Sequence, residues 1–314
     1  MKFLNKKNII LVLIGIMILL VGCESDSSTE GTHKTFIGGT DSIKFEFMEE
    51  TPPNEVYDGG QQPFEVTVSL ENEGEYDVPL NDIKVLLSGF YPSDFGNPNV
   101  QKNPDENLDK SYIDADGEIE RGTITYVNFP GFNFGGSLAG NNEYVIRAEI
   151  CYKYGTIAQA DLCVLEDLTP DEDEEEVCEV DDQKSIDVSS APIQIENFKE
   201  EVAGTRKIKF SFDMVHRSNG LISQLGTDCS KELIDEDKVW VEVDSGLSGL
   251  SCSGLESGTS TTGYTKMYGG KRKVICMQDV TSVTGDFEKK VNILLKYDYK
   301  EHEERDILVK HTTN

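Results

Sequence analysis

Apolar and polar residues alternate along much of this chain, and this alternation restricts what the chain can fold into. From Phe64 to Leu70, apolar residues alternate with Glu, Thr and Ser, and the stretches 208–214 and 291–299 show the same period of two. Such a period places apolar side chains on one face of a strand and polar ones on the other. Residues 35–165 contain no convincing helical period. The sequence therefore predicts an all-β protein of half-buried antiparallel strands. Further strands are predicted at 43–47, 83–87, 193–195, 239–243 and 307–309.

An acidic block divides the predicted strands into two groups. Eleven of the seventeen residues from Glu166 to Asp182 are Asp or Glu, and such a run stays extended in water because its like charges repel. Strand patterns fill 35–165 before it and 183–314 after it, each close to the ~100 residues of an immunoglobulin-like domain. We therefore expect two tandem immunoglobulin-like β-sandwich domains, joined by an acidic linker at 166–182.

The amino terminus has the pattern of a secretory signal followed by a lipidation site. Lysines precede an apolar run at 9–21, which is shorter than the about 20 residues that a membrane span needs. Cys23 follows Gly22 directly and polar residues come next, so the segment resembles the lipobox of lipoproteins. We expect a signal peptide at 1–22, a lipid on Cys23 and a flexible tether at 23–34. An uncleaved anchor helix or a type IV pilin-like leader are the alternatives.

Six cysteines remain once Cys23 is assigned to the lipid. An even number of cysteines outside the membrane indicates disulfides. Zinc is the competing interpretation, but no two cysteines have C-x-x-C spacing and no His lies near them in finger spacing. We expect disulfides to involve Cys151, Cys163, Cys178, Cys229, Cys252 and Cys276.

Two chain reversals are predicted, and the first suggests a disulfide. Strand patterns at 144–152 and 160–164 pair apolar with apolar and plus with minus when Cys151 is placed opposite Cys163. We therefore expect a hairpin with a cross-strand Cys151–Cys163 bond on its outer face. The second reversal is a polar turn at 301–304, ahead of a return strand.

The other pairings have weaker support. The separation of Cys252 from Cys276 suits neighbouring segments and suggests a second bond. Cys178 and Cys229 would then tie the end of the linker to the second domain. Six cysteines allow 15 pairings, so only the first bond has independent support.

The looser region at 88–142 has two features that suggest binding. Six of its aromatic residues lie among Gly, Asn and Pro and could form a binding surface: Phe90, Tyr91, Phe95, Phe129, Phe132 and Phe134. We expect them instead to fold back over the edge of the sandwich. The sequence at 114–117 is similar to a calcium loop. Tyr112 and Thr123 occupy positions where an EF-hand needs ligands, so an acidic turn is the better interpretation.

No catalytic set, metal-ligand set or cofactor motif is found in the sequence. His216 ends a strand pattern, where we expect it to make a local hydrogen bond. Trp240 lies on the outer face of a strand, where packing against a loop is favoured over a contact patch. The formal net charge of −29 argues against nucleic-acid binding but permits divalent cations or a cationic partner.

Three local patterns resemble a group of archaeal extracytoplasmic proteins with tandem immunoglobulin-like domains. They are 151–156 followed by Cys163, the pair Cys252 and Cys276, and the strand end at 296–299. The resemblance implies no activity. Together with the amino terminus, it predicts a lipoprotein on the outer face of the cell membrane that acts as a non-catalytic binding, adhesion or envelope-structure module. Its partner would be an unknown extracellular protein or glycan. The alternatives are a pilin-like or filament subunit and a calcium-dependent binding protein.

Overall fold

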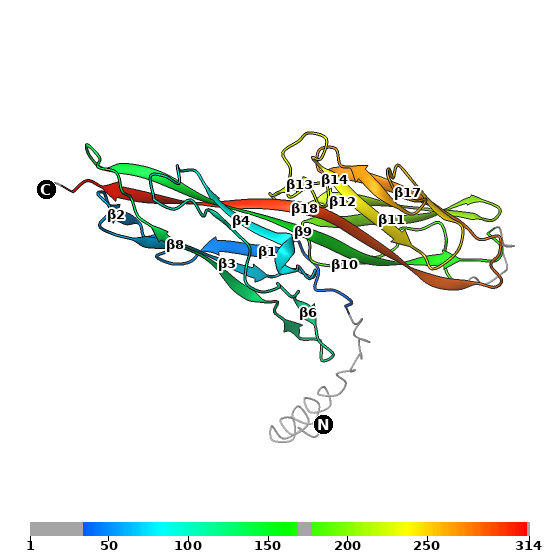
Figure 1. Ribbon diagram of the computed structural model, residues 1–314. Helices are drawn as coiled ribbons and strands as arrows, with labels where there is room; N and C mark the ends of the chain where they lie inside the picture. Colours follow the sequence, from blue (N-terminus) through cyan, green and yellow to red (C-terminus); the bar gives the residue numbers. More distant parts are fainter. Residues whose placement is uncertain (1–33, 169–176, 313–314) are drawn as a thin grey trace, which may run out of the picture. The chain divides into compact units, whose positions relative to one another are not determined.

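The computed structural model describes residues 34–168 and 177–312 (Figure 1). The predicted signal peptide, Cys23, the tether up to residue 33 and the centre of the acidic linker lie outside the described residues. Apart from one short 3-10 helix, η1, the regular structure described is all strand, which confirms the all-β prediction. The elements are β1 (Ile43–Phe47), β2 (Glu55–Tyr57), β3 (Phe64–Asn72), η1 (Leu80–Asp82), β4 (Ile83–Ser88), β5 (Gln101–Lys102), β6 (Tyr112–Ile113), β7 (Ile119–Glu120), β8 (Ile124–Phe132), β9 (Asn142–Val164), β10 (Ile186–Val188), β11 (Ile193–Gly204), β12 (Lys207–His216), β13 (Leu221–Ser223), β14 (Lys238–Asp244), β15 (Leu250–Ser253), β16 (Thr262–Lys266), β17 (Lys271–Asp279) and β18 (Phe287–Lys310).

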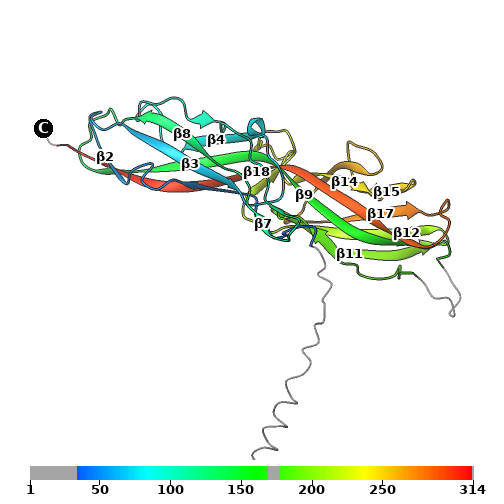
Figure 2. The same cartoon turned by 90° about the horizontal axis from the view of Figure 1, so that it is seen from below.

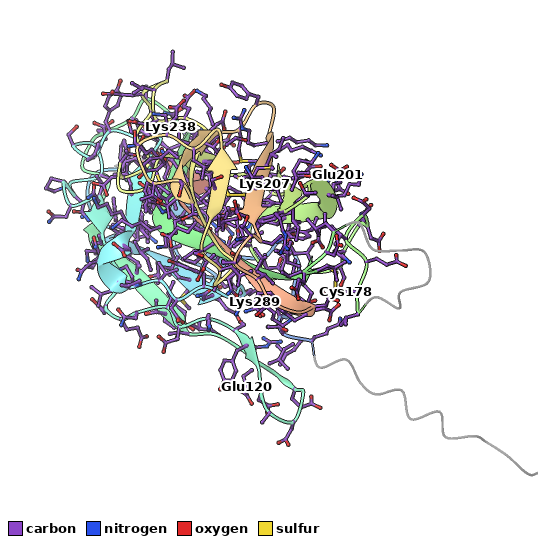
Figure 3. The ribbon with its side chains drawn as sticks, turned by 90° about the vertical axis from the view of Figure 1, so that its right-hand side faces the viewer. Glu120, Cys178, Glu201, Lys207, Lys238 and Lys289 are labelled. Atoms are coloured by element: carbon purple, nitrogen blue, oxygen red, sulfur yellow. A yellow bond between two sulfur atoms is a disulfide. The ribbon has the colours of Figure 1, made fainter. Side chains whose placement is uncertain are left out.

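These strands form several sheets, of which the largest has nine strands. Its main path is β16-β14-β18-β9-β4-β5, with β10 added to β9 and with β13 and β2 added to β18. A three-stranded sheet has the order β1-β3-β8, and a four-stranded sheet has the order β11-β12-β17-β15. Strands β6 and β7 form a small hairpin, which stands away from the sheets with Glu120 on its second strand (Figure 3). The described pairings are antiparallel except that of β18 with β2.

Two long strands, β9 and β18, form the centre of the fold. They run side by side in both views (Figures 1 and 2) and pair residue by residue from Phe287 opposite Val164 to Val309 opposite Asn142. The predicted hairpin within 144–164 is therefore wrong, and so is the predicted turn at 301–304. Both segments stay extended because each strand finds its partner in the other.

Gly155 explains why the middle of β9 does not turn. It lies against the ring of Tyr76, and a Cβ atom at this position would be only 2.4 Å from Cε2 of that ring. The glycine therefore allows a close approach between backbone and ring rather than a turn. The inward-facing residues of β9 also have even numbers along the whole strand, from Ile146 through Tyr154 to Val164. A hairpin does not require this continuity, whereas a single strand does.

The two smaller sheets cover different parts of β9 and β18 (Figure 1). On the three-stranded side, Ser42 Oγ lies 2.8 Å from the hydroxyl of Tyr152. On the four-stranded side, Thr156 donates to the carbonyl of Ile193 at 2.7 Å. Because β9 and β18 pair with each other beneath both smaller sheets, the described residues from Lys34 onward form one compact unit. Two tandem domains are not confirmed.

The core also shows where the aromatic residues of the loose region go. Phe95 and Phe134 fold back from loops and are buried, as expected, whereas Tyr91 is 77% exposed. Phe129 and Phe132 are also buried, but they lie on β8 within the three-stranded sheet and not in a loop. The acidic turn is confirmed as well. It closes the β6–β7 hairpin, where the Asp114 carboxylate accepts the N–H groups of residues 116 and 118.

All six remaining cysteines form disulfides, but two of the predicted pairings are wrong. Cys252 pairs with Cys276 as expected. Cys151 instead pairs with Cys229, and Cys163 pairs with Cys178. The physical reason is that Cys151 and Cys163 lie twelve residues apart on one continuous strand, or about 40 Å at ~3.3 Å per residue. A disulfide needs Cα atoms within about 7 Å.

Candidate binding groove

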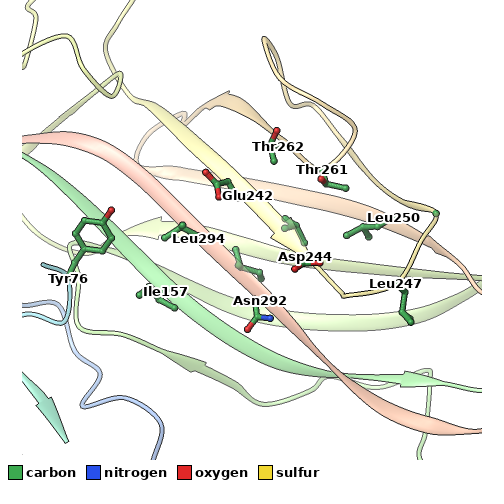
Figure 4. A pocket seen from close by; sticks show the side chains of 13 residues that line it. Tyr76, Ile157, Glu242, Asp244, Leu247, Leu250, Thr261, Thr262, Asn292 and Leu294 are labelled. Atoms are coloured by element: carbon green, nitrogen blue, oxygen red, sulfur yellow. The ribbon is translucent and has the colours of Figure 1, made fainter.

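A groove of about 680 Å³ lies on the outer face of the nine-stranded sheet (Figure 4). One row of side chains crosses four strands: Thr262 on β16, Glu242 on β14, Leu294 on β18 and Ile157 on β9 are successive neighbours. These positions point outward because the residues beside them, such as Val243, are buried. Leu294 and Ile157 are partly exposed and form an apolar floor.

A second row of polar side chains lies beside the first. It consists of Asp244 on β14, Asn292 on β18 and Gln159 on β9. The Gln159 amide donates to Oδ1 of Asn292 at 2.9 Å. This contact leaves the Asn292 amino group free to donate into the groove, next to the exposed carboxylate of Asp244.

The two ends of the groove are formed by Tyr76 and by the loop after β14 (Figure 4). The Tyr76 ring packs on Tyr154 with centroids 5.5 Å apart, and its carbonyl accepts from Asn72 at 2.8 Å. In the loop, the buried Ser245 hydroxyl donates to Gln278 at 2.7 Å and accepts the N–H of Leu247. Both ends are therefore fixed by buried contacts.

The charges in the groove are partly balanced. Burial alone would raise the pKa of Glu242, but hydrogen bonds from Lys296 at 2.9 Å and Trp240 Nε1 at 2.8 Å outweigh burial and lower the pKa. Glu242 is therefore ionised at neutral pH and neutralised by Lys296. Asp244 accepts the N–H of Gly246 at 2.8 Å and has no cationic partner in the part of the chain that the structure describes.

The groove has the composition of a small-ligand site. An apolar floor with a few fixed polar groups, in a volume of this size, is typical of small-ligand sites. Nowhere in 34–168 or 177–312 do three or more His, Cys, Asp or Glu side chains gather in a way that could hold a metal ion. The same described ranges contain no helix with the length and apolar character needed to cross a membrane.

The structure shows the surroundings of two residues that the sequence analysis singled out, Trp240 and His216, but not those of Cys23. The Trp240 ring packs on Tyr264 of the neighbouring strand with centroids 4.8 Å apart, and its indole N–H supports Glu242. His216 does make a hydrogen bond, but with the distant Tyr299 hydroxyl at 3.1 Å. Cys23 lies outside the described residues, so its lipid stays a prediction.

Sequence reasoning missed the groove itself. Its residues come from segments between 76 and 294 that only the sheet brings together. One local signal was present: Leu294 is apolar at an outward position, so Ile293, Leu294 and Leu295 interrupt the alternation. An apolar residue on an outward face indicates that something covers or binds that face.

Comparison with known proteins does not supply a function. No protein-family model matches the chain, and a search of curated proteins finds no significant match.

Proposed function

We propose that this protein is a lipid-anchored binding module on the outer face of the cell membrane, and that the groove is its ligand site. The anchor is inferred from the lipobox-like sequence that ends at Cys23. Three disulfides suit an oxidising compartment outside the cytoplasm. We further infer that each cover sheet and the part of β9 and β18 beneath it correspond to one immunoglobulin-like sandwich, the two being fused through the long strands.

The observation that favours ligand binding is the pair of adjacent rows in the groove. Leu294 and Ile157 offer a flat apolar surface, with the Tyr76 ring at one end. Asp244 offers acceptors and Asn292 offers a donor beside that surface. A sugar ring has the matching chemistry, because it combines an apolar face with hydroxyl groups at its edge. We therefore propose an envelope glycan as the ligand.

The anchor is tested by the intact mass of protein extracted from its own membranes. We expect a chain that begins at Cys23 and carries lipid, and whose mass rises by about six protons on reduction, as three disulfides require. A chain that retains residues 9–21 would overturn the lipoprotein proposal and favour the pilin-like alternative.

The ligand is tested by saturation-transfer NMR with oligosaccharides released from the envelope of the same cells. We expect binding that Asn292→Ala weakens about tenfold, the size of one lost hydrogen bond with its partner left unpaired. Glu288→Ala is the matched control, since Glu288 is exposed on the same face of β18 four residues away. Equal binding by both variants, or no binding by the native protein, would rule out the groove as a glycan site.

A further inference from the structure

The edge of β18 is incompletely occupied. One side of this strand pairs with β9 along its length. The other side is shared by β14, by β13 and by β2, whose pairing with β18 starts at Leu308. The pairing with β13 ends at Lys300. Within the described ranges no strand pairs with residues 301–307 on this side, so the nine-stranded sheet contains an edge gap.

Backbone hydrogen-bonding groups point into this edge gap. On this side of β18, Leu308 donates its N–H to Asn54 at 2.9 Å and the Lys310 carbonyl accepts from Asp58 at 2.9 Å. Because alternate residues of a strand direct their N–H and C=O groups the same way, those at 302, 304 and 306 also point into the gap. Unpaired strand edges of this kind accept added strands.

A second groove, of about 540 Å³, lies beside the edge gap. Its lining comes from 300–303 of β18, 43–45 of β1 and the loop at 219–221. Leu221 is 68% exposed in this groove, whereas Ile43 and Phe45 are buried and lie at the border of the core. Side chains of a strand added to β18 would therefore have space to enter on the inward side.

The inward charges next to the edge gap are mostly negative. Inward positions of β18 here are Glu301, Glu303 and Arg305. The Arg305 guanidinium is occupied, since it donates to the carbonyls of Met48 at 2.7 Å and Phe47 at 3.2 Å.

The remaining charges of the groove leave two carboxylates without a cation. Lys300 pairs with Glu149, and Lys44 lies 3.6 Å from Glu46. Glu301 accepts only the hydroxyl of Tyr152 at 3.0 Å, and Glu303 has no cationic partner in the described part of the chain. Inward charges at an edge repel apolar strands, and two uncompensated carboxylates attract a basic one.

We propose that the edge gap binds an extended segment of a partner protein as an added β-strand, with Lys or Arg at alternate positions. The unpaired backbone groups provide the strand pairing, and Glu301 and Glu303 select the basic side chains. Seven residues of β18 span about 23 Å at ~3.3 Å per residue, so a segment of five to seven residues fits. This proposal is independent of the glycan groove.

The test uses the full extracellular chain and a fluorescent seven-residue peptide in which Lys alternates with Val and Thr. Fluorescence anisotropy should detect binding of this peptide and none of a version with Glu in place of Lys. Methylating the peptide nitrogens that face β18 should weaken binding about tenfold or more, since strand pairing depends on those donors.

Two protein variants separate strand addition from general charge attraction. Glu301→Gln with Glu303→Gln should weaken binding about tenfold, whereas Glu118→Gln with Glu120→Gln, on the exposed β6–β7 hairpin (Figure 3), should leave it unchanged. On binding, hydrogen exchange should slow at the amides of 302, 304 and 306. Equal binding by the N-methylated peptide, unchanged exchange at these amides or no preference for the basic peptide would overturn the proposal.

Discussion

The two halves of the fold share β9 and β18 but are stabilised in different ways. The aromatic half, which lies under β1, β3 and β8, contains a cluster in which Phe95 packs against four other rings. The disulfide half, which lies under β11, β12, β17 and β15, contains Cys163–Cys178 and Cys252–Cys276. The disulfide half also buries Phe198, Phe210 and Phe212, so the clearer difference between the halves is that two of the described disulfides lie in this one. Cys151–Cys229 lies near their boundary, next to Tyr152.

The largest effect should come from the aromatic half. We expect Phe95→Ala to lower the free energy of unfolding by about 3–5 kcal/mol, because it removes a fully buried ring and leaves a cavity among its four ring neighbours. Urea unfolding measures the loss, and hydrogen exchange should place it first in β3, β4 and β8. Tyr91→Ala, at a 77% exposed position nearby, is the control. A loss as small as that of the control would contradict the importance of the aromatic cluster.

Removing disulfides should test the covalent side of the comparison. Replacing Cys151 and Cys229 with Ala opens a loop of sequence separation 78, and replacing Cys163 and Cys178 opens one of 15. The chain-entropy account gives losses of about 4.5 and about 3 kcal/mol respectively. The midpoints of urea unfolding of the two double variants show which of the two losses in stability is larger. The reverse order would mean that native contacts around Cys163, rather than loop length, determine the effect.

The sequence predicted elements well and long-range pairing poorly, and these cysteines show why. Alternation located most strands, including β3 and β12, because it depends on neighbouring residues only. Both hairpins were wrong because the sequence does not say whether a polar or glycine-containing stretch turns or stays extended. The partner strand decides this. The wrong pairing of Cys151 with Cys163 followed directly, and the groove could not be found because its rows exist only across β14, β18 and β9.

Buried carboxylates should give the halves opposite pH responses. In the disulfide half, burial raises the pKa of Glu200 to about 8, although it accepts the Cys163 N–H at 3.0 Å and lies 4.0 Å from Lys184. In the unfolded chain this carboxyl titrates near 4.5. Its contribution to stability is therefore complete below pH 4.5 and is lost as pH rises to about 8.

Glu200→Gln should remove this loss. We expect the variant to exceed the native protein in stability by up to about 5 kcal/mol at pH 9 and to differ little at pH 4.5. Thermal unfolding at pH 4.5 and at pH 9 measures the difference in stability between the variant and the native protein. Equal pH dependence in the two proteins would show that Glu200 is not protonated in the folded state.

Asp58 in the aromatic half should respond at the other end of the pH scale. It accepts hydrogen bonds from the Thr312 hydroxyl and His311 Nδ1 and from the N–H groups of Leu138 and Thr312, which hold its pKa well below 3.8. Its contribution is present above pH 3.8 and is lost as pH falls toward its folded pKa. Asp58→Asn should reduce the acid sensitivity of hydrogen exchange at β2 while leaving β11 unchanged.

The smallest effect concerns the boundary at which the halves meet. Gly155→Ala would press a methyl group against the Tyr76 ring, and we expect a loss of about 1–3 kcal/mol from overpacking. Gly140→Ala, where a Cβ meets nothing within 4 Å, is the control and should be neutral or slightly stabilising. Combining Gly155→Ala with Tyr76→Ala should cost less than the two losses added together, because the clash disappears. If β9 couples the halves, Gly155→Ala should speed hydrogen exchange in β4 and in β11 together. Faster exchange in only one of them would mean that the halves unfold independently despite their shared strands.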